Sequence, residues 1–198
     1  MTRIARWIRM AASIFVLVTS FIFLTAISNA GLTAQAANST ADKHQRSLSS
    51  FLDGLKSADN QHEASLIEDD IWKLWLKAPD EQTQALLDRA LERRRWYDFA
   101  GAKLLLDEVI DRHPDYAEGW NQRAFILFLQ EKFDQSLSDL EMALELEPRH
   151  FGALAGQARI LMRQGRFAIG QNILKRAVKL HPFLRERSMI VKTQEQEL

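Results

Sequence analysis

The sequence predicts an all-α protein, built as a solenoid of antiparallel helical hairpins. The four prolines of the 198-residue chain, Pro79, Pro114, Pro148 and Pro182, are 35, 34 and 34 residues apart. No window alternates apolar and polar residues as a half-buried strand does, and the chain has only eight glycines. Residues of like size also recur with a period of 34, which is the signature of a repeat architecture.

The first 36 residues predict a secretory signal peptide. Three arginines lie within the first nine residues, and residues 11–30 then carry no charge. Residues 34–36, Ala-Gln-Ala, fit an A-x-A cleavage site. The alternative is an uncleaved anchor, because about 20 apolar residues suffice to cross a bilayer. We therefore expect an exported, periplasmic protein, or else one anchored in the inner membrane and facing the periplasm.

The charge balance and the absence of cysteine exclude several classes of protein. Cleavage after Ala36 removes three arginines and no acid, so 26 basic and 26 acidic residues become 23 and 26, a net charge of −3. This is too mild to predict binding to nucleic acid or to an anionic membrane. Without cysteine there is no lipoprotein anchor, disulfide framework or thiolate metal site. Residues 37–47 are polar and are expected to form a flexible linker.

Alignment on the prolines gives three 34-residue units, over residues 83–116, 117–150 and 151–184. Small residues at positions 8 and 20 allow two helices to approach closely, an aromatic at position 17 opens the second helix, and proline follows it because proline cannot continue a helix. The residues at positions 8, 17 and 24 are Ala90, Ala124 and Ala158, then Phe99, Phe133 and Phe167, then Leu106, Leu140 and Leu174. The pattern predicts helices over 82–96, 99–112, 117–129, 133–147, 151–163 and 167–180.

The flanking segments are expected to close the two ends of the stack. Residues 48–80 follow the same spacing as a degenerate hairpin, with helices over 48–57 and 61–76. Its predicted inner face is Ala64, Ile67, Ile71, Leu74 and Trp75. Residues 185–198 predict a capping helix and tail, since terminal units that cover the core are expected of solenoids.

The three units resemble the tetratricopeptide repeat, whose pattern they match in register over residues 83–184. The chain as a whole is similar to small exported tetratricopeptide proteins of Gram-negative bacteria. The resemblance implies a right-handed superhelix, with a concave groove lined by the first helix of each unit, and a role in protein–protein interaction.

The resemblance indicates which residues would line the groove. Most of them are apolar or cationic, and two carry side-chain amides. Such a groove suits an amphipathic helix or an extended peptide with acidic residues. Alternatively, the arginines are simply solvated and the groove packs on the linker or on a neighbouring copy. One subset of the family binds C-terminal carboxylates with Lys, Asn and Arg; the matching positions here are Leu87, Leu91, Gln122, Gly152 and Gly156, so that clamp is absent. The candidates are Leu91, Arg94, Arg95, Asn121, Gln122, Phe125, Phe128, Arg159, Met162 and Arg163.

Catalytic and metal-binding motifs are missing from the sequence, and no cofactor is predicted. The five histidines form no i, i+3 or i, i+4 pair, and His113 and His181 are expected at helix C-termini, where the helix dipole favours them. Trp72 and Trp75 would suit a sugar-stacking platform, but burial in a core is favoured.

The sequence thus predicts a non-catalytic adaptor or scaffold of the cell envelope, whose partner is another protein. One alternative is a structural subunit that self-associates, as a homo-oligomer, or is tethered to the membrane. Another is an enzyme or a carbohydrate-binding protein that uses the region of Trp72 and Trp75.

Overall fold

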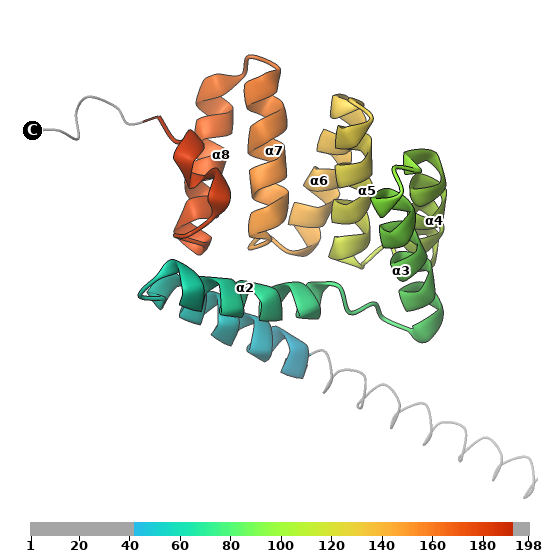
Figure 1. Ribbon diagram of the computed structural model, residues 1–198, viewed down its shortest axis with the longest axis horizontal. Coiled ribbons are helices and arrows are strands. Elements are labelled where there is room, and N and C mark those ends of the chain that lie inside the picture. Colours follow the sequence, from blue (N-terminus) through green and yellow to red (C-terminus); the bar gives the residue numbers. More distant parts are fainter. Residues whose placement is uncertain (1–41, 192–198) are drawn as a thin grey trace, which may run out of the picture. The chain divides into compact units, whose positions relative to one another are not determined.

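The computed structural model describes residues 42–191, and every element in that range is a helix (Figure 1). The predicted signal peptide or anchor, the start of the linker and the last seven residues lie outside the described range. The described residues from Leu48 onward form one compact unit, and the contacts below lie within it. Between residues 42 and 191, no helix is both long enough and apolar enough to cross a membrane.

Three antiparallel hairpins form the body of the molecule. They are α3 (Glu81–Arg95) with α4 (Phe99–Arg112), α5 (Ala117–Leu129) with α6 (Phe133–Leu146), and α7 (Phe151–Arg163) with α8 (Phe167–Leu180). Each helix begins and ends within one residue of its predicted position. The all-α solenoid expected from the sequence is the observed fold.

The side chains at the repeat positions are buried as the pattern of small and large residues predicts. The alanines at position 8 are almost completely buried, and so are the leucines at position 24. In each hairpin the turn contains the residue at position 15 of the 34-residue unit, and this residue has a left-handed backbone conformation: Tyr97 (φ 60°), Glu131 (φ 57°) and Gly165 (φ 79°). A local pattern of 34 residues therefore accounts for each hairpin and its turn.

The N-terminal hairpin begins earlier than predicted. Residues 42–57 are helical, so the prediction of a linker over 42–47 is wrong. Leu48, Leu52 and Leu55 bury one face of this helix, and a polar segment can extend a helix whose face is held in that way. The second helix is α2 (Gln61–Trp75), which begins where the Asn60 side chain accepts a hydrogen bond from the Glu63 amide.

The N-terminal hairpin shares its core with the last unit and not with the first. Its buried residues, among them Leu52, Ile71 and Trp75, share one core with Phe151 and Leu174. In Figure 1, α2 runs across one edge of the stack, and the chain then crosses to α3 at the far end. The first unit has a separate core, which takes in Leu76 from just beyond α2. The expectation that this hairpin caps the stack ahead of the first unit is therefore wrong, because its large apolar side chains are buried against α7 and α8.

The predicted C-terminal capping helix is, in its described part, a short 3-10 helix, η1 (Arg185–Met189). Leu184 is buried ahead of it and joins the shared core, whereas no residue of η1 is buried. The Gln171 side chain then donates to the Met189 carbonyl and accepts from the Val191 amide. Without a buried face, nothing holds this segment in a longer α-helix.

Candidate functional site

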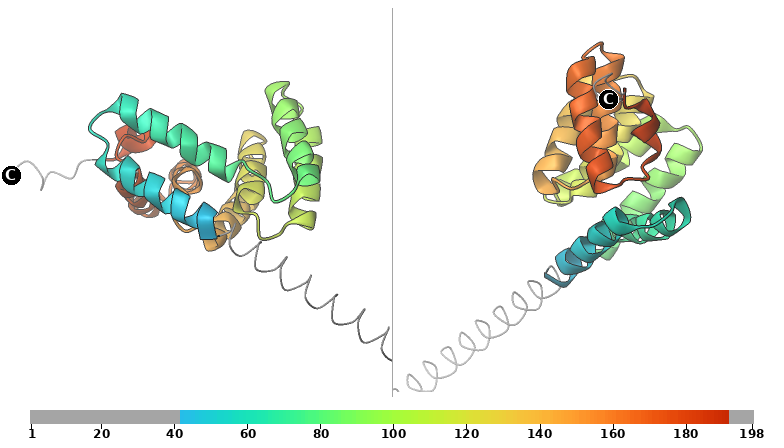
Figure 2. Two further views of the ribbon diagram at one scale, coloured as in Figure 1. Left: turned by 90° about the horizontal axis from the view of Figure 1, so that it is seen from below. Right: turned by 90° about the vertical axis from the view of Figure 1, so that its left-hand side faces the viewer.

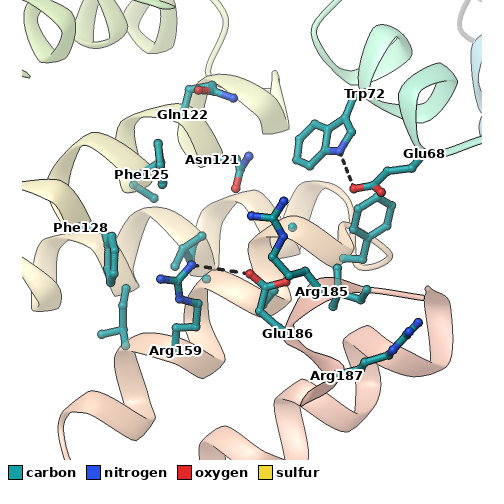
Figure 3. A pocket seen from close by; sticks show the side chains of 18 of the residues that line it. Glu68, Trp72, Asn121, Gln122, Phe125, Phe128, Arg159, Arg185, Glu186 and Arg187 are labelled. Carbon is teal, nitrogen blue, oxygen red and sulfur yellow. Dashed lines mark hydrogen bonds and ion pairs between the residues drawn. The ribbon is translucent and has the colours of Figure 1, made fainter. Parts of the chain in front are cut away.

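A cleft of about 870 Å³ lies between the solenoid and the two segments that flank it. α2 forms one wall, residues 183–188 form another, and α5 and α7 supply the floor. Figure 3 shows side chains from these four segments pointing toward one another. The views of Figure 2 show how α2 and the C-terminal segment approach the same part of the solenoid.

Small residues on α7 make room for α2. A Cβ atom added at Gly152 would lie 2.7 Å from the Trp72 ring, so only glycine permits this approach. At Gly156 an added Cβ would be 3.5 Å from Leu140, which is ordinary contact. The space at Gly152 is thus partly filled by the chain itself.

The two tryptophans of α2 do not form an exposed platform. Trp75 is buried and stacks on His150, with ring centroids 3.8 Å apart and an interplanar angle of 12°. Trp72 is half-buried at the cleft wall, and its indole N–H donates to Glu68 at 3.3 Å. With one of its two rings inaccessible, the pair cannot stack against a sugar.

A buried polar network lies beneath the floor. The Glu118 carboxylate is almost fully buried and accepts hydrogen bonds from Asn121 at 3.1 Å and from Gln122. His150 Nδ1 accepts from the Ala153 amide, so its proton is on Nε2, which donates to Glu118 at 2.8 Å. These bonds satisfy the buried carboxylate. They also hold the Asn121 and Gln122 side chains in place at the cleft surface.

Arg94 reaches the floor from α3. Its guanidinium donates to Gln122 Oε1 at 2.7 Å and lies over the Phe125 ring, 5.3 Å from the centroid. Burial lowers the pKa of Arg94, while the Glu118 carboxylate opposes that shift. An arginine with so high an ordinary pKa stays charged, so it is a fixed cation at this end of the cleft.

The mouth of the cleft carries further charges. Arg159 lies over the Phe128 ring at 5.3 Å, with its guanidinium 3.6 Å from Glu186 of η1. The hydrogen bond from His181, 3.2 Å long, lowers the pKa of Glu68, against the effect of partial burial. The cations among the lining residues are Arg94, Arg159, Arg185 and Arg187, and the acids are Glu68 and Glu186, a net charge of +2.

Six of the ten predicted groove residues line this cleft, namely Arg94, Asn121, Gln122, Phe125, Phe128 and Arg159. The other four do not. Leu91 packs on the core of the first unit, and Met162 is buried in the shared core. Arg95 is exposed, and Arg163 pairs with Glu131 at 2.8 Å. These four side chains lie outside the cleft because it is bounded by α2 and η1 and does not extend along the whole length of the solenoid.

Sequence reasoning missed the two flanking walls. Trp72 was expected in a core, while Glu68, Phe183 and Glu186 were not expected at a site at all. The sequence does carry one signal, the glycine at position 152 in the first helix of the last unit, where the lack of a side chain allows a close neighbour. That signal does not say which segment is the neighbour.

Two further features of the sequence can be located in the structure. At the positions of the carboxylate clamp, Leu87 is buried and Gln122 is bonded to Glu118. Within the described range, no three His, Cys, Asp or Glu side chains are grouped so as to hold a metal ion.

Known proteins resemble this chain in sequence and in fold. No family model matches the sequence. A TPR repeat-containing protein of Rhizobium etli is 33% identical over 171 residues, which cover 85% of this chain and 81% of that one. Among solved structures, the TPR2B domain of yeast Sti1 in its pHsp70 complex is 22% identical, covers 51% of this chain and 81% of that chain, and has a TM-score of 0.50. The first TPR of Spaghetti (RPAP3), bound to the HSP90 peptide SRMEEVD, is 16% identical, covers 57% and 89%, and has a TM-score of 0.54. On the strength of the Rhizobium relative, this chain belongs to the tetratricopeptide repeat proteins.

Proposed function

We propose that this protein is a non-catalytic adaptor of the cell envelope, which holds a peptide or amphipathic helix of another protein in its cleft. One observation carries the proposal. The cleft combines aromatic rings with a net positive charge, between walls contributed by segments far apart in the chain. Apolar anchors beside a few fixed polar groups are what a peptide-binding groove provides.

The charges favour a partner segment with acidic residues. Arg159 and Arg187 each lie over an aromatic ring, of Phe128 and Phe183, at 5.3 Å. The N–H edge of a guanidinium stacked in this way can bind a carboxylate through two hydrogen bonds, and at Arg159 a partner carboxylate would displace Glu186, which lies 3.6 Å away. Acidic side chains of the partner would meet this edge, while its apolar side chains meet Phe125 and Phe128.

The structural neighbours support the class of function and not the identity of the ligand. The yeast Sti1 and Spaghetti domains are described in complexes with pHsp70 and with an HSP90 peptide. This chain has Leu87, Gly152 and Gly156 where a carboxylate clamp would need charged or amide side chains. A different acidic segment is therefore the expected ligand.

The location in the cell rests on the N-terminal residues. The three arginines, the uncharged run over 11–30 and the A-x-A motif at 34–36 are what a signal peptide requires. We place the protein in the periplasm, with an inner-membrane anchor as the alternative. N-terminal sequencing of the protein recovered from the soluble and membrane fractions distinguishes the two: a first residue at position 37 means cleavage, and an intact start in the membrane fraction means an anchor.

Site-specific photocrosslinking in cells tests the adaptor function. A photoreactive residue replaces Phe125 in the full chain, and a matched control carries it at Leu104, which is exposed and outside the cleft. We expect a discrete adduct from position 125, lost with Arg159→Glu and retained with Arg159→Lys. An equal adduct from position 104, or one unaffected by Arg159→Glu, would show that the cleft is not the site. An adduct with a second copy of this chain would support the self-associating subunit.

A further inference from the structure

The turns within the three repeat hairpins gather on one edge of the molecule. Because the three hairpins run in parallel, the turns between α3 and α4, α5 and α6, and α7 and α8 lie at the edge opposite α2 (Figure 1). We call residues 95–100, 129–132 and 163–169 the turn edge. Exposed apolar side chains and unpaired cations occur together at this edge.

Large apolar side chains on the turn edge point into solvent. Trp96 and Tyr97 are adjacent, and 78% and 81% of their surfaces are exposed. Tyr97 packs edge-on against Phe99, at 6.0 Å between ring centroids, so the rings form a small aromatic tip. Leu129, Phe167 and Ile169 add exposed apolar surface at the other two turns.

The turn requires a left-handed residue at position 97, but it does not require a tyrosine there. The conformation of Tyr97 is left-handed, like that of Glu131 and Gly165 at the same repeat position, and glycine is the residue that adopts it without steric cost. The turn is held by hydrogen bonds from the Tyr97 amide to the Arg94 carbonyl and from the Phe99 amide to the Tyr97 carbonyl. The chain therefore keeps a strained residue whose side chain adds little to the core, which is typical of a contact made with something else.

Each turn also presents one cation that makes no ion pair with any described residue. Arg93 pairs with Asp98, and Arg163 pairs with Glu131, so these charges cancel. Arg95, Lys132 and Arg166 are exposed and remain, one for each turn. Two acids close to them, Glu92 in the last turn of α3 and Asp134 two residues after Lys132, likewise make no ion pair with a described residue.

We propose that the turn edge docks on the surface of an anionic lipid bilayer. Tryptophan and tyrosine prefer the membrane interface, because their rings are apolar while their N–H and O–H groups remain hydrated. Arginine and lysine beside them extend their charged ends to the headgroups. The net charge of −3 expected after cleavage hides this local excess of positive charge. Contact through this edge leaves the cleft, on other faces of the molecule, free for a protein partner.

A dye in the turn edge reports this contact directly. The chain has no natural cysteine, so a single cysteine at Ala100 carries an environment-sensitive dye on the full chain, and a matched control carries it at His62 on α2. The probes are vesicles of phosphatidylcholine alone or with roughly 30% phosphatidylglycerol. The comparison holds whether or not residues 11–30 are retained, because both dyes report from the same chain.

We expect the dye at position 100 to enter the lipid interface only with anionic vesicles, and the dye at 62 to stay in water. Changing Arg95, Lys132 and Arg166 together to glutamine should weaken binding about 100-fold, since each cation near such a surface contributes about fivefold. These side chains make no ion pairs with described residues, so the melting temperature should not change. Tyr97→Gly should also weaken binding while keeping the fold, because it relieves the left-handed strain.

Three results would overturn the proposal. They are a dye at position 100 that stays in water with anionic vesicles, an equal response at position 62, and undiminished binding of the triple variant. A fluorescence change that grows with protein concentration and needs no vesicles would instead make this edge a contact between copies of the chain.

Discussion

The first and the last repeat units have the same sequence pattern but different surroundings. In the last unit, α7 and α8 share one core with the N-terminal hairpin, through Phe151 and Leu174. The first unit has its own core, to which the chain ahead of it contributes Leu76. The repeat pattern thus determines a hairpin, while side chains outside the pattern determine what that hairpin packs against.

The difference also locates the cleft. α2 reaches the last unit, and its wall is held there by the stacking of Trp75 on His150 and by the hydrogen bond between Glu68 and His181. The first unit contributes Arg94 to the cleft and projects Trp96 and Tyr97 away from it. The middle and last units therefore form most of the solenoid side of the cleft, and the first unit presents an exposed aromatic tip.

Phe151→Ala should have the largest effect on stability. Phe151 is buried against Trp72, Trp75 and His181, so its removal should cost about 3–5 kcal/mol. Amide hydrogen exchange should show α2 losing protection while α3 and α4 keep theirs. Leu87→Ala in the first unit is the matched control, in which α3 and α4 should lose protection while α2 keeps it. Unchanged protection of α2 in Phe151→Ala would mean that the shared core does not hold the hairpin.

Gly170→Ala should destabilise the last unit by about 1–3 kcal/mol, because the added Cβ would lie 2.6 Å from the Met162 side chain and 2.9 Å from the Ala158 carbonyl. The first unit has alanine at the same repeat position, Ala102, so the crossing in the last unit is the closer one. Gly156→Ala is the control, since its Cβ has ordinary contacts and alanine favours a helix. Urea denaturation measures both, and equal stabilities would contradict the closer crossing.

Tyr97→Gly should stabilise the protein by about 1 kcal/mol, and Gly165→Ala should destabilise it by a similar amount. Both positions are left-handed, and nothing lies within 4 Å of a Cβ added at Gly165, so only the backbone strain differs. Thermal unfolding of the two variants checks the signs. A stabilising Gly165→Ala would show that this turn is not strained.

Glu68→Gln should have the smallest effect, visible as a change in acid sensitivity. The pKa of Glu68 is held below its ordinary 4.5 by the hydrogen bond from His181. A carboxylate whose folded pKa is lowered stabilises the fold above its unfolded pKa, and loses that contribution as the pH falls through the folded value. The melting temperature should therefore fall less for the variant than for the wild type between about pH 6 and pH 3. The neighbouring Asp69→Asn is the control. An identical fall of the melting temperature in the wild type and in Glu68→Gln would show that the hydrogen bond between Glu68 and His181 does not stabilise the fold.

Much of the fold is readable from the sequence, and about half of the site. The helices of the three units lie within one residue of prediction, because alanine at position 8 and leucine at position 24 act within a single hairpin. Phe125, Phe128 and Arg159 were expected in the groove and line the cleft. Met162 faces the core instead, since helical periodicity places a residue on a face without saying which face the neighbouring segment covers.

The sequence by itself determined the hairpins, their turns and their order, since each depends on contacts within 34 residues. Only the tertiary structure decided that the N-terminal hairpin packs on the last unit and makes a wall of the cleft. The interactions responsible join Ser49 to Arg149, 100 residues apart, and Glu68 to His181, 113 residues apart. Local periodicity carries no information about such pairs. They form because the large side chains of α2 must be buried, and Gly152 with its neighbours leaves them a place to be buried.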